Sequence, residues 1–297
     1  MADPTLSAIE EAFAAAGVHG CLHALDVDSG AEIGWHPDEP VVTASVFKLP
    51  VLLELFRQES AGEIDAAQPI TVPAEGRTTG PFGISVMRDS VTLSLRDLAW
   101  LMIAVSDNAA TDVVCARVGL DRVQGTVERL GLTGTRVPDD CAGIFATMLE
   151  DAGISTMEEW NGELDAALLA KLRALDPLHT NCTTPRDMTR LLRLVWTDEA
   201  AAPEACAEVR RVLSGQVWPH RLASGFPEDD VATAGKTGTL PTLRNEVGVV
   251  QYADGGRYAV AVFTRSTNLA AKHPAADAVI GRSARLAVEA LRHRAGL

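Results

Sequence analysis

Three short motifs in this sequence carry side chains that could act together in nucleophilic catalysis: Ser45-Val-Phe-Lys48, Ser106-Asp107-Asn108 and Lys236-Thr237-Gly238. Ser45 and Lys48 are three residues apart, so at the start of a helix their side chains share a face and the amine comes within reach of the hydroxyl. A lysine among apolar residues needs a partner, because an unpaired buried ammonium is costly and tends to lose its proton. A deprotonated lysine is a base, and a serine beside it is a candidate nucleophile.

Each motif also has a simpler interpretation when it is taken alone. Lys48 could be a surface lysine whose stem lies along its apolar neighbours, although the largely apolar run from 46 to 53 favours a buried helix. The second motif could be a plain helix N-cap, because serine, aspartate and asparagine are all preferred there. The third could end a phosphate-binding loop, but that pattern requires glycine at position 230, where the sequence has Asp230. Nucleotide binding is therefore not expected.

The elements that must position these motifs follow from hydrophobic periodicity and turn signals. Helical spacing of apolar residues predicts helices over 5–17, 45–56, 94–105, from 107 toward 118, and over 275–292. Runs of β-branched and apolar residues predict two hairpins, one of strands 21–26 and 31–35 and one of strands 245–251 and 257–264, with a further strand over 233–239. Residues 67–92 are rich in glycine, proline and threonine and are expected to form loops.

Sheet segments from both ends of the chain bracket a helical middle. We therefore expect an α/β sheet domain made of residues 1–40 and 216–297, and a helical domain of residues 41–215. An atypical insertion at about 138–180 interrupts the helical domain. Its second half is predicted to be helical, since Thr156-Met-Glu-Glu159 fits a capping box and the leucines at 164, 168, 172 and 175 recur at helical spacing.

Composition limits the partners of the protein. The 297 residues include 40 acidic and 26 basic side chains, a net charge of −14, so nucleic acids and anionic membranes are poor partners. The longest apolar run, residues 98–105, is too short to cross a bilayer, which takes about 20 residues. The N-terminus lacks the basic start and apolar stretch of a secretory leader, so a cytoplasmic location is expected, or a secreted or periplasmic one if a leader has been removed.

Metal and disulfide chemistry is not expected from the sequence. His19 and His23 are four residues apart in a strand-like region, a spacing with no meaning as a ligand pair, and are interpreted as structural. We expect a monomer that uses no metal and no organic cofactor and binds a small-molecule substrate. Neither a disulfide framework nor a structural zinc site is indicated by the five cysteines, which are odd in number, irregularly spaced and without a C-x-x-C pair: Cys21, Cys115, Cys141, Cys182 and Cys206.

The three motifs, in this order, resemble those of the penicillin-recognising serine hydrolases, and specifically of the class A β-lactamase family. Residues 181–188 are similar to the start of the helix that follows the Ω-loop of that family, and residues 244–249 to its next sheet strand. The resemblance covers nearly the whole chain except about 138–180. It implies an α/β (α+β) fold in which a five-stranded antiparallel sheet is flanked by helices and joined to an all-helical domain, with the site at their junction.

The resemblance also implies a role for each motif residue. Ser45 would be the nucleophile, Lys48 the base, and Ser106 the group that passes the proton to the leaving nitrogen or oxygen. Backbone N–H groups of Ser45 and Thr239 would form the oxyanion hole. Asn108 would hold an amide side chain of the substrate, and Thr239 would also contact the substrate. A substrate carboxylate would bind to Lys236 and Thr237, with Arg244 or Arg221 as an additional cation.

One departure from the family bears on deacylation. Class A enzymes carry an Ω-loop glutamate in an E-x-x-L-N motif that activates the hydrolytic water, and no such motif occurs here, where Cys141 stands near that position. We expect a serine hydrolase that a β-lactam, or another cyclic or activated amide or ester, acylates on Ser45, with impaired or altered deacylation. The alternatives are an intracellular esterase, peptidase or acyltransferase of a biosynthetic pathway, and a non-catalytic β-lactam-binding domain. Five acids of the insertion could replace the glutamate, although each is more simply explained as a surface acid: Asp139, Asp140, Glu150, Asp151 and Glu163.

Overall fold

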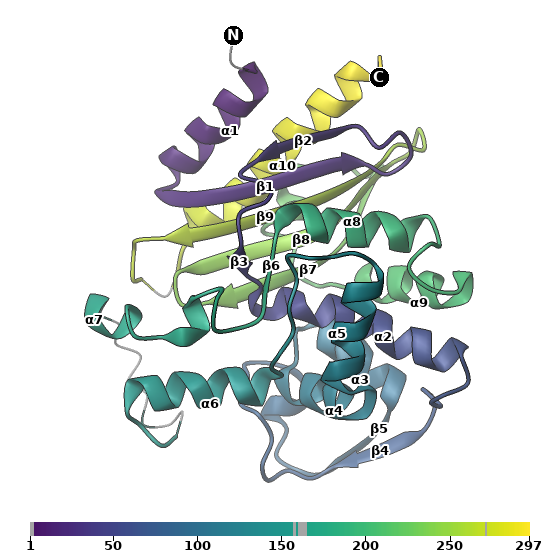
Figure 1. Ribbon diagram of the computed structural model, residues 1–297, viewed down its shortest axis with the longest axis vertical. Helices are drawn as coiled ribbons and strands as arrows, with labels where there is room; N and C mark the ends of the chain where they lie inside the picture. The colour runs from purple at the N-terminus through teal and green to yellow at the C-terminus, as the bar shows by residue number, and fades with distance from the viewer. Residues whose placement is uncertain (1–2, 157–158, 160–164, 271) are drawn as a thin grey trace.

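The computed structural model describes residues 3–156, 159, 165–270 and 272–297. A five-stranded antiparallel sheet in the order β2-β1-β9-β8-β7 forms one half of the molecule (Figure 1). Both predicted hairpins are confirmed, because β1 pairs with β2 and β8 with β9, and the long strand β1 joins the two in one sheet through β9. The strands are β1 (Val18–Asp26), β2 (Glu32–Trp35), β7 (Val231–Leu240), β8 (Leu243–Tyr252) and β9 (Arg257–Ser266).

Helices α1 (Pro4–Ala15) and α10 (Pro274–Arg294) cover one face of this sheet. Alternate residues of each strand enter their core, so Val260 and Val262 of β9 pack there. Gly20 of β1 lets α1 approach closely, because a Cβ at this position would lie 2.3 Å from the Phe13 ring. The predicted helices at both ends of the chain are confirmed.

The opposite face of the sheet packs on a layer of helices around the buried helix α2 (Lys48–Ser60). One hydrophobic core continues from α2 to the inner residues of the sheet, among them Val247 and Phe263. The domain boundaries expected near residues 40 and 215 therefore stay a prediction. The other helices of this layer are α3 (Leu95–Ala104), α4 (Asn108–Val118), α5 (Leu120–Arg129), α8 (Pro185–Trp196) and α9 (Pro203–Leu213).

Residues 67–92 are more ordered than the sequence predicted. Strands β4 (Pro69–Val72) and β5 (Val91–Ser94) pair antiparallel, and a short 3-10 turn, η2 (Gly83–Val86), lies between them. The side-chain hydroxyls of Thr71 and Thr92, which are opposite each other, lie 2.8 Å apart in a hydrogen bond. Four-residue strands of this kind give little periodic signal, so the glycine and proline content of the segment dominated the prediction.

The insertion is helical in its first half, whereas the sequence predicted a helix in its second half. Helix α6 (Cys141–Ala152) begins at the N-cap Asp140, whose carboxylate accepts from Gly143 N at 2.9 Å, and ends at Gly153 in the left-handed region. The predicted cap at Thr156 does accept from Glu159 N, but the helix expected after it, including Leu164, lies largely outside the described residues. Between residues 165 and 180, which are described, the helical elements are α7 (Ala166–Leu169) and η3 (Arg173–Leu175).

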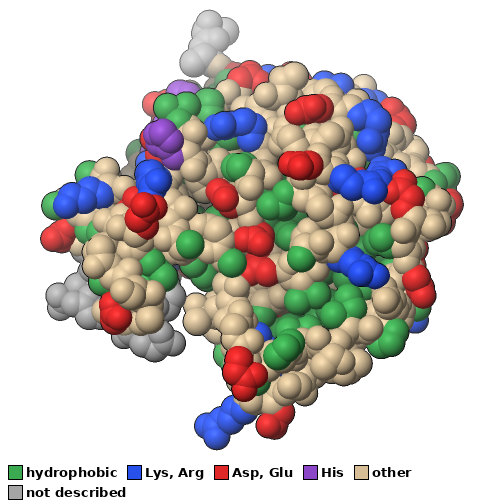
Figure 2. Space-filling view, turned by 60° about the horizontal axis from the view of Figure 1, so that its bottom comes forward, with side chains coloured by type: hydrophobic (Ala, Val, Ile, Leu, Met, Phe, Trp, Pro, Cys, Tyr) green, Lys and Arg blue, Asp and Glu red, His purple; other side chains and the backbone are tan. Residues whose placement is uncertain are grey.

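No helix in the described part of the chain is both long and apolar enough to span a bilayer. On the face drawn in Figure 2, Asp and Glu side chains are interspersed with Lys and Arg. The described residues of that face therefore gather no basic patch of the kind that phosphate backbones require.

Candidate active site

Ser45 lies where the chain passes from the sheet into the helical layer. It belongs to the 3-10 turn η1 (Ala44–Phe47), which leads directly into α2, and it is partly exposed while its neighbours in the turn are buried. Ala44 has a φ of 46°, in the left-handed region. Gly238 of β7 packs against this turn, where a Cβ would lie 2.6 Å from Thr43 O. The glycine of the third motif therefore lets β7 lie close to the candidate nucleophile.

Lys48 is fully buried, so the surface interpretation of this residue is excluded. Its ammonium donates to Ser106 O at 2.9 Å, to Asn108 Oδ1 at 3.0 Å and to Ser106 Oγ at 3.3 Å. These three acceptors replace the water that the ammonium loses on burial. They also join the first motif to the second, which lies 58 to 60 residues further along the chain.

The second motif is both a helix cap and part of the site. Asp107 is the N-cap of α4 and accepts from Ala110 N at 3.2 Å, as the simpler interpretation predicted. Ser106 has a φ of 61°, a conformation in which a non-glycine residue is strained. This backbone geometry turns the Ser106 carbonyl toward Lys48. Asn108, in the first turn of α4, donates through Nδ2 to Thr79 O at 2.9 Å.

Lys236 is also fully buried, and its ammonium donates to Thr237 O at 2.8 Å. Burial, followed by the nearby Lys48 charge, holds the pKa of Lys236 well below its usual range. Glu246 on the neighbouring strand opposes this effect, and burial raises the pKa of that carboxyl to about 7. Gln216 completes the network, because its Nε2 donates to Glu246 and its Oε1 accepts from Thr237 N, both at 2.6 Å.

The sequence analysis did not identify Glu246 or Gln216 as parts of the site. The available signal for Glu246 was a glutamate directly before the apolar run 247–250 of a predicted strand. Gln216 carries no such signal, because it follows α9 in an irregular segment that the sequence does not direct toward β7.

The two candidate arginines have different surroundings. Arg221 is buried and donates to Gly238 O and Asn245 O at 3.0 Å and to Thr239 Oγ1 at 2.8 Å. It also pairs with Asp277 of α10 at 2.7 Å. Arg244 donates to the carbonyl of Leu243 at 2.8 Å and lies 3.7 Å from the same aspartate. Through its bonds to Gly238 and Thr239, Arg221 stabilises the end of β7.

A cavity of about 370 Å³ opens in front of Ser45. Arg221 lines it, whereas Lys48, Lys236 and Arg244 do not. Aromatic side chains from distant segments form part of its wall, and the sequence had not indicated them. Two of them, Phe82 and Trp218, have ring centroids 4.9 Å apart. The motif residues and aromatic residues that line it are Ser45, Ser106, Asn108, Thr237, Thr239, Phe82, Phe145 and Trp218.

A second, smaller cavity of about 60 Å³ also borders Ser45. Cys141, Ile144 and Phe145 of α6 line it together with Ser45 and Asn108. The Cys141 thiol donates to Asn108 Oδ1 over 3.5 Å, and burial raises its pKa to about 11. Among the described residues no carboxylate lines this cavity.

Three of the five candidate acids of the insertion are engaged in other contacts. Asp140 caps α6, and Glu150 and Asp151 pair with Arg173. Asp139 is not among the residues that line either cavity beside Ser45, and Glu163 lies outside the described residues. The sequence analysis did not consider Asp112 of α4, which accepts from Cys141 N at 2.8 Å and whose pKa burial raises to about 6.

A serine and two lysines, held between an antiparallel sheet and a helical layer, are the arrangement of the β-lactamase-like serine hydrolase family. The chain belongs to the beta-lactamase enzyme family, which it matches over residues 5–291. It is 32% identical to the beta-lactamase regulatory protein BlaB of Streptomyces cacaoi over 97% of both chains. It is similar to the beta-lactamase structure from Sphaerobacter thermophilus, with a TM-score of 0.77 and 26% identity over 96% of each chain. The structure of PBP-A has the same fold, with a TM-score of 0.78 and 19% identity over 98% of this chain and 97% of that chain.

Proposed function

We propose that a β-lactam, or another cyclic or activated amide or ester, acylates the protein on Ser45 and that the acyl-enzyme is hydrolysed slowly. One observation carries this proposal. The small cavity beside Ser45 is lined by the Cys141 thiol, the polar side chains of Asn108 and Thr239 and several apolar side chains, without a carboxylate among the described residues. A nucleophile without a carboxylate beside it to activate water favours a long-lived ester.

Acylation needs a path for one proton. Ser45 Oγ attacks the substrate carbonyl, the C–N or C–O bond of the substrate breaks, and the hydroxyl proton passes through Lys48 to the leaving atom. Ser106 supports the second transfer, because its Oγ lies 3.3 Å from the Lys48 amine and the residue lines the substrate cavity. Backbone N–H groups of Ser45 and Thr239 are the proposed oxyanion hole.

The residues of β7 that line the larger cavity are the proposed binding groups for the substrate. Thr237 and Thr239 line it and are the proposed partners of a substrate carboxylate, with Asn108 as the partner of an amide. A carboxylate bound there would favour the charged form of Lys236, directly behind Thr237, and Arg221 adds positive potential from the same side. The aromatic wall favours an acyl group with an apolar or aromatic side chain.

Among the described residues that line the cavities beside Ser45, no carboxylate is available as a base for deacylation. The Cys141 thiol, with a pKa of about 11, is protonated at neutral pH and offers neither a negative charge nor strong acceptor atoms to water. Asp112 already accepts from Cys141 N through one oxygen and from Thr78 through the other, so it is engaged in holding the start of α6. Hydrolysis of the ester is therefore expected to be the slow step.

A second candidate function is sensing. The Streptomyces cacaoi relative carries the name of a regulatory protein, and a long-lived acyl-enzyme suits a receptor that reports a β-lactam without destroying it. The third candidate is an esterase or peptidase that hydrolyses another acyl group, or an acyltransferase in which a nucleophile other than water enters the larger cavity and releases the acyl group.

Intact-protein mass spectrometry over time, with benzylpenicillin and with a chromogenic cephalosporin, tests the proposal. An adduct of one equivalent that decays slowly is the expected result. Steady multiple turnover without an accumulated adduct would contradict slow deacylation and exclude a purely sensory role. The absence of any adduct with either compound would contradict acylation by β-lactams.

A further inference from the structure

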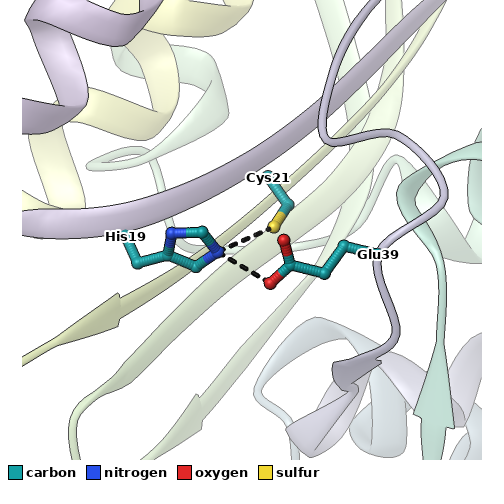
Figure 3. Close-up of side chains that lie close together, drawn as sticks. All are labelled: His19, Cys21 and Glu39. Carbon is teal, nitrogen blue, oxygen red and sulfur yellow. Dashed lines mark hydrogen bonds and ion pairs between the residues drawn. The ribbon is translucent and has the colours of Figure 1, made fainter.

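His19, Cys21 and Glu39 form a compact cluster outside the cavities that flank Ser45. His19 and Cys21 are two residues apart on β1, so their side chains share a face of the strand, and Glu39 reaches them from the segment between β2 and β3 (Figure 3). His19 Nε2 lies 2.7 Å from Glu39 Oε1 and 3.6 Å from Cys21 Sγ. The donor atoms of the three side chains all lie within 4.8 Å of one another.

The geometry of the cluster distinguishes a metal site from a catalytic triad. In a triad the histidine uses one ring nitrogen toward the nucleophile and the other toward the acid. Here the thiol and the carboxylate both contact the same nitrogen, Nε2, as the two dashed lines of Figure 3 show. Three different donor atoms that converge on one point match the first coordination shell of a metal ion.

The distances suit a tetrahedral ion. With Zn–S near 2.3 Å and Zn–N or Zn–O near 2.0–2.2 Å, tetrahedral ligand atoms lie about 3.5 Å apart. The separation of His19 Nε2 and Cys21 Sγ is already 3.6 Å. The contact between His19 and Glu39 has to widen from 2.7 Å by less than about 1 Å. Glu39 can make this movement because its side chain is 38% exposed.

We propose that His19 Nε2, Cys21 Sγ and the Glu39 carboxylate bind one Zn²⁺ ion. A thiolate, an imidazole and a carboxylate are a zinc donor set, whereas Mg²⁺ and Ca²⁺ take oxygen ligands. Binding releases the proton of the Cys21 thiol to solvent as the Zn–S bond forms. All three residues line a cavity of about 340 Å³, which leaves room for water or a small ligand at the fourth position.

The site lies close to the segment that carries Ser45. Glu39 comes two residues before β3 (Val41–Val42), which leads into η1, so a bound ion ties β1 to this segment. Asn245 lines the same cavity and donates to Val42 O at 2.9 Å and to Thr43 O at 3.2 Å. The ion is therefore expected to stabilise the folded chain without contacting the substrate cavity.

Calorimetric titration of the chelator-treated full chain with Zn²⁺ tests the proposal, and Co²⁺ absorption reports the ligand type. The wild type should take up one equivalent, and the Co²⁺ form should show a thiolate charge-transfer band. His19→Ala and Glu39→Gln should weaken Zn²⁺ binding by about 100-fold or more, since loss of an outer-shell partner alone costs 10–100-fold. Cys21→Ser should also remove the charge-transfer band.

Two matched variants serve as controls. Cys206→Ser changes a buried cysteine of α9, and His293→Ala changes an exposed histidine near the end of α10; both should bind Zn²⁺ like the wild type. Because Cys21 is buried and its variant could misfold, the half-exposed positions His19 and Glu39 carry the test, with folding checked by circular dichroism. No stoichiometric uptake by the wild type, or unchanged affinity in His19→Ala and Glu39→Gln, would overturn the proposal.

Discussion

Lys48 Nζ lies 3.0 Å from Asn108 Oδ1, and the same oxygen accepts the thiol of Cys141 over 3.5 Å. One amide oxygen thus joins the proposed base of acylation to Cys141, the residue that the family resemblance predicts near the position of the deacylation base. Asn108 Nδ2 is held by Thr79 O, so the orientation of this amide is set from both ends. Asn108 therefore positions Lys48 in addition to its proposed contact with substrate.

Replacement of Ser45 by alanine should abolish covalent labelling by a fluorescent penicillin while the chain stays folded. The change removes one hydroxyl at a partly exposed position, so the free energy of unfolding should change by less than about 1 kcal/mol. Intact-protein mass spectrometry and urea unfolding measure the two effects. An adduct that forms at the wild-type rate in Ser45→Ala would contradict the assignment of the nucleophile.

Replacement of Lys48 by alanine should slow acylation at least about 100-fold, the usual contribution of a positioned proton-transfer group. Lys48→Arg should not restore the rate, because a guanidinium stays protonated at any working pH and does not fit the same three acceptors. The exposed Lys171→Ala is the control and should react like the wild type. Rescue by arginine would mean that Lys48 supplies charge and not proton transfer. Acylation rates measured by stopped flow distinguish proton transfer from a purely electrostatic role of Lys48.

Benzylpenicillin should give a burst of one equivalent per site, followed by turnover far slower than the ~10 s⁻¹ typical of enzymes. Cys141→Ala should leave the slow phase unchanged within about twofold, since a thiol with a pKa of about 11 stays protonated at pH 7 and activates no water. Quench-flow product analysis separates the two phases. Burst-free hydrolysis in the wild type, or loss of the slow phase in Cys141→Ala, would contradict this account.

The folded-state pKa of Glu246, about 7, should make the stability of the protein depend on pH. Because this pKa lies above the ordinary value of 4.5, the folded chain holds the proton more tightly than the unfolded chain does. The stabilisation is therefore complete below pH 4.5 and is lost as the pH rises through about 7. The full effect corresponds to roughly 3 kcal/mol.

Urea unfolding of wild type and Glu246→Gln at pH 5 and pH 8 measures this effect. The wild type should lose more free energy of unfolding than Glu246→Gln over this interval, because the glutamine cannot ionise. Glu204→Gln, at an exposed position of α9, should follow the wild type. Equal losses in the wild type and Glu246→Gln would show that Glu246 does not titrate in this range.

The sequence by itself determined the strands and helices of the sheet half and the order of the three motifs. These features are local: a tight turn such as Asp254-Gly255-Gly256 between β-branched runs specifies a hairpin wherever it occurs, and helical periodicity specifies α10. The resemblance of the motifs also anticipated the five-stranded sheet. The exclusion of a phosphate-binding loop needed only the identity of Asp230.

Only the tertiary structure decided which distant side chains meet. Cys141 and Ser45 line one cavity, and Glu39 lies close to Cys21, because segments far apart in the sequence pack together in ways that no local pattern encodes. The interpretation of His19 as a structural residue rested on spacing along one strand, whereas the carboxylate that completes its cluster comes from another segment. Periodicity constrains neighbours within about two turns of a helix or along one strand, while packing of the whole chain sets the contacts between segments.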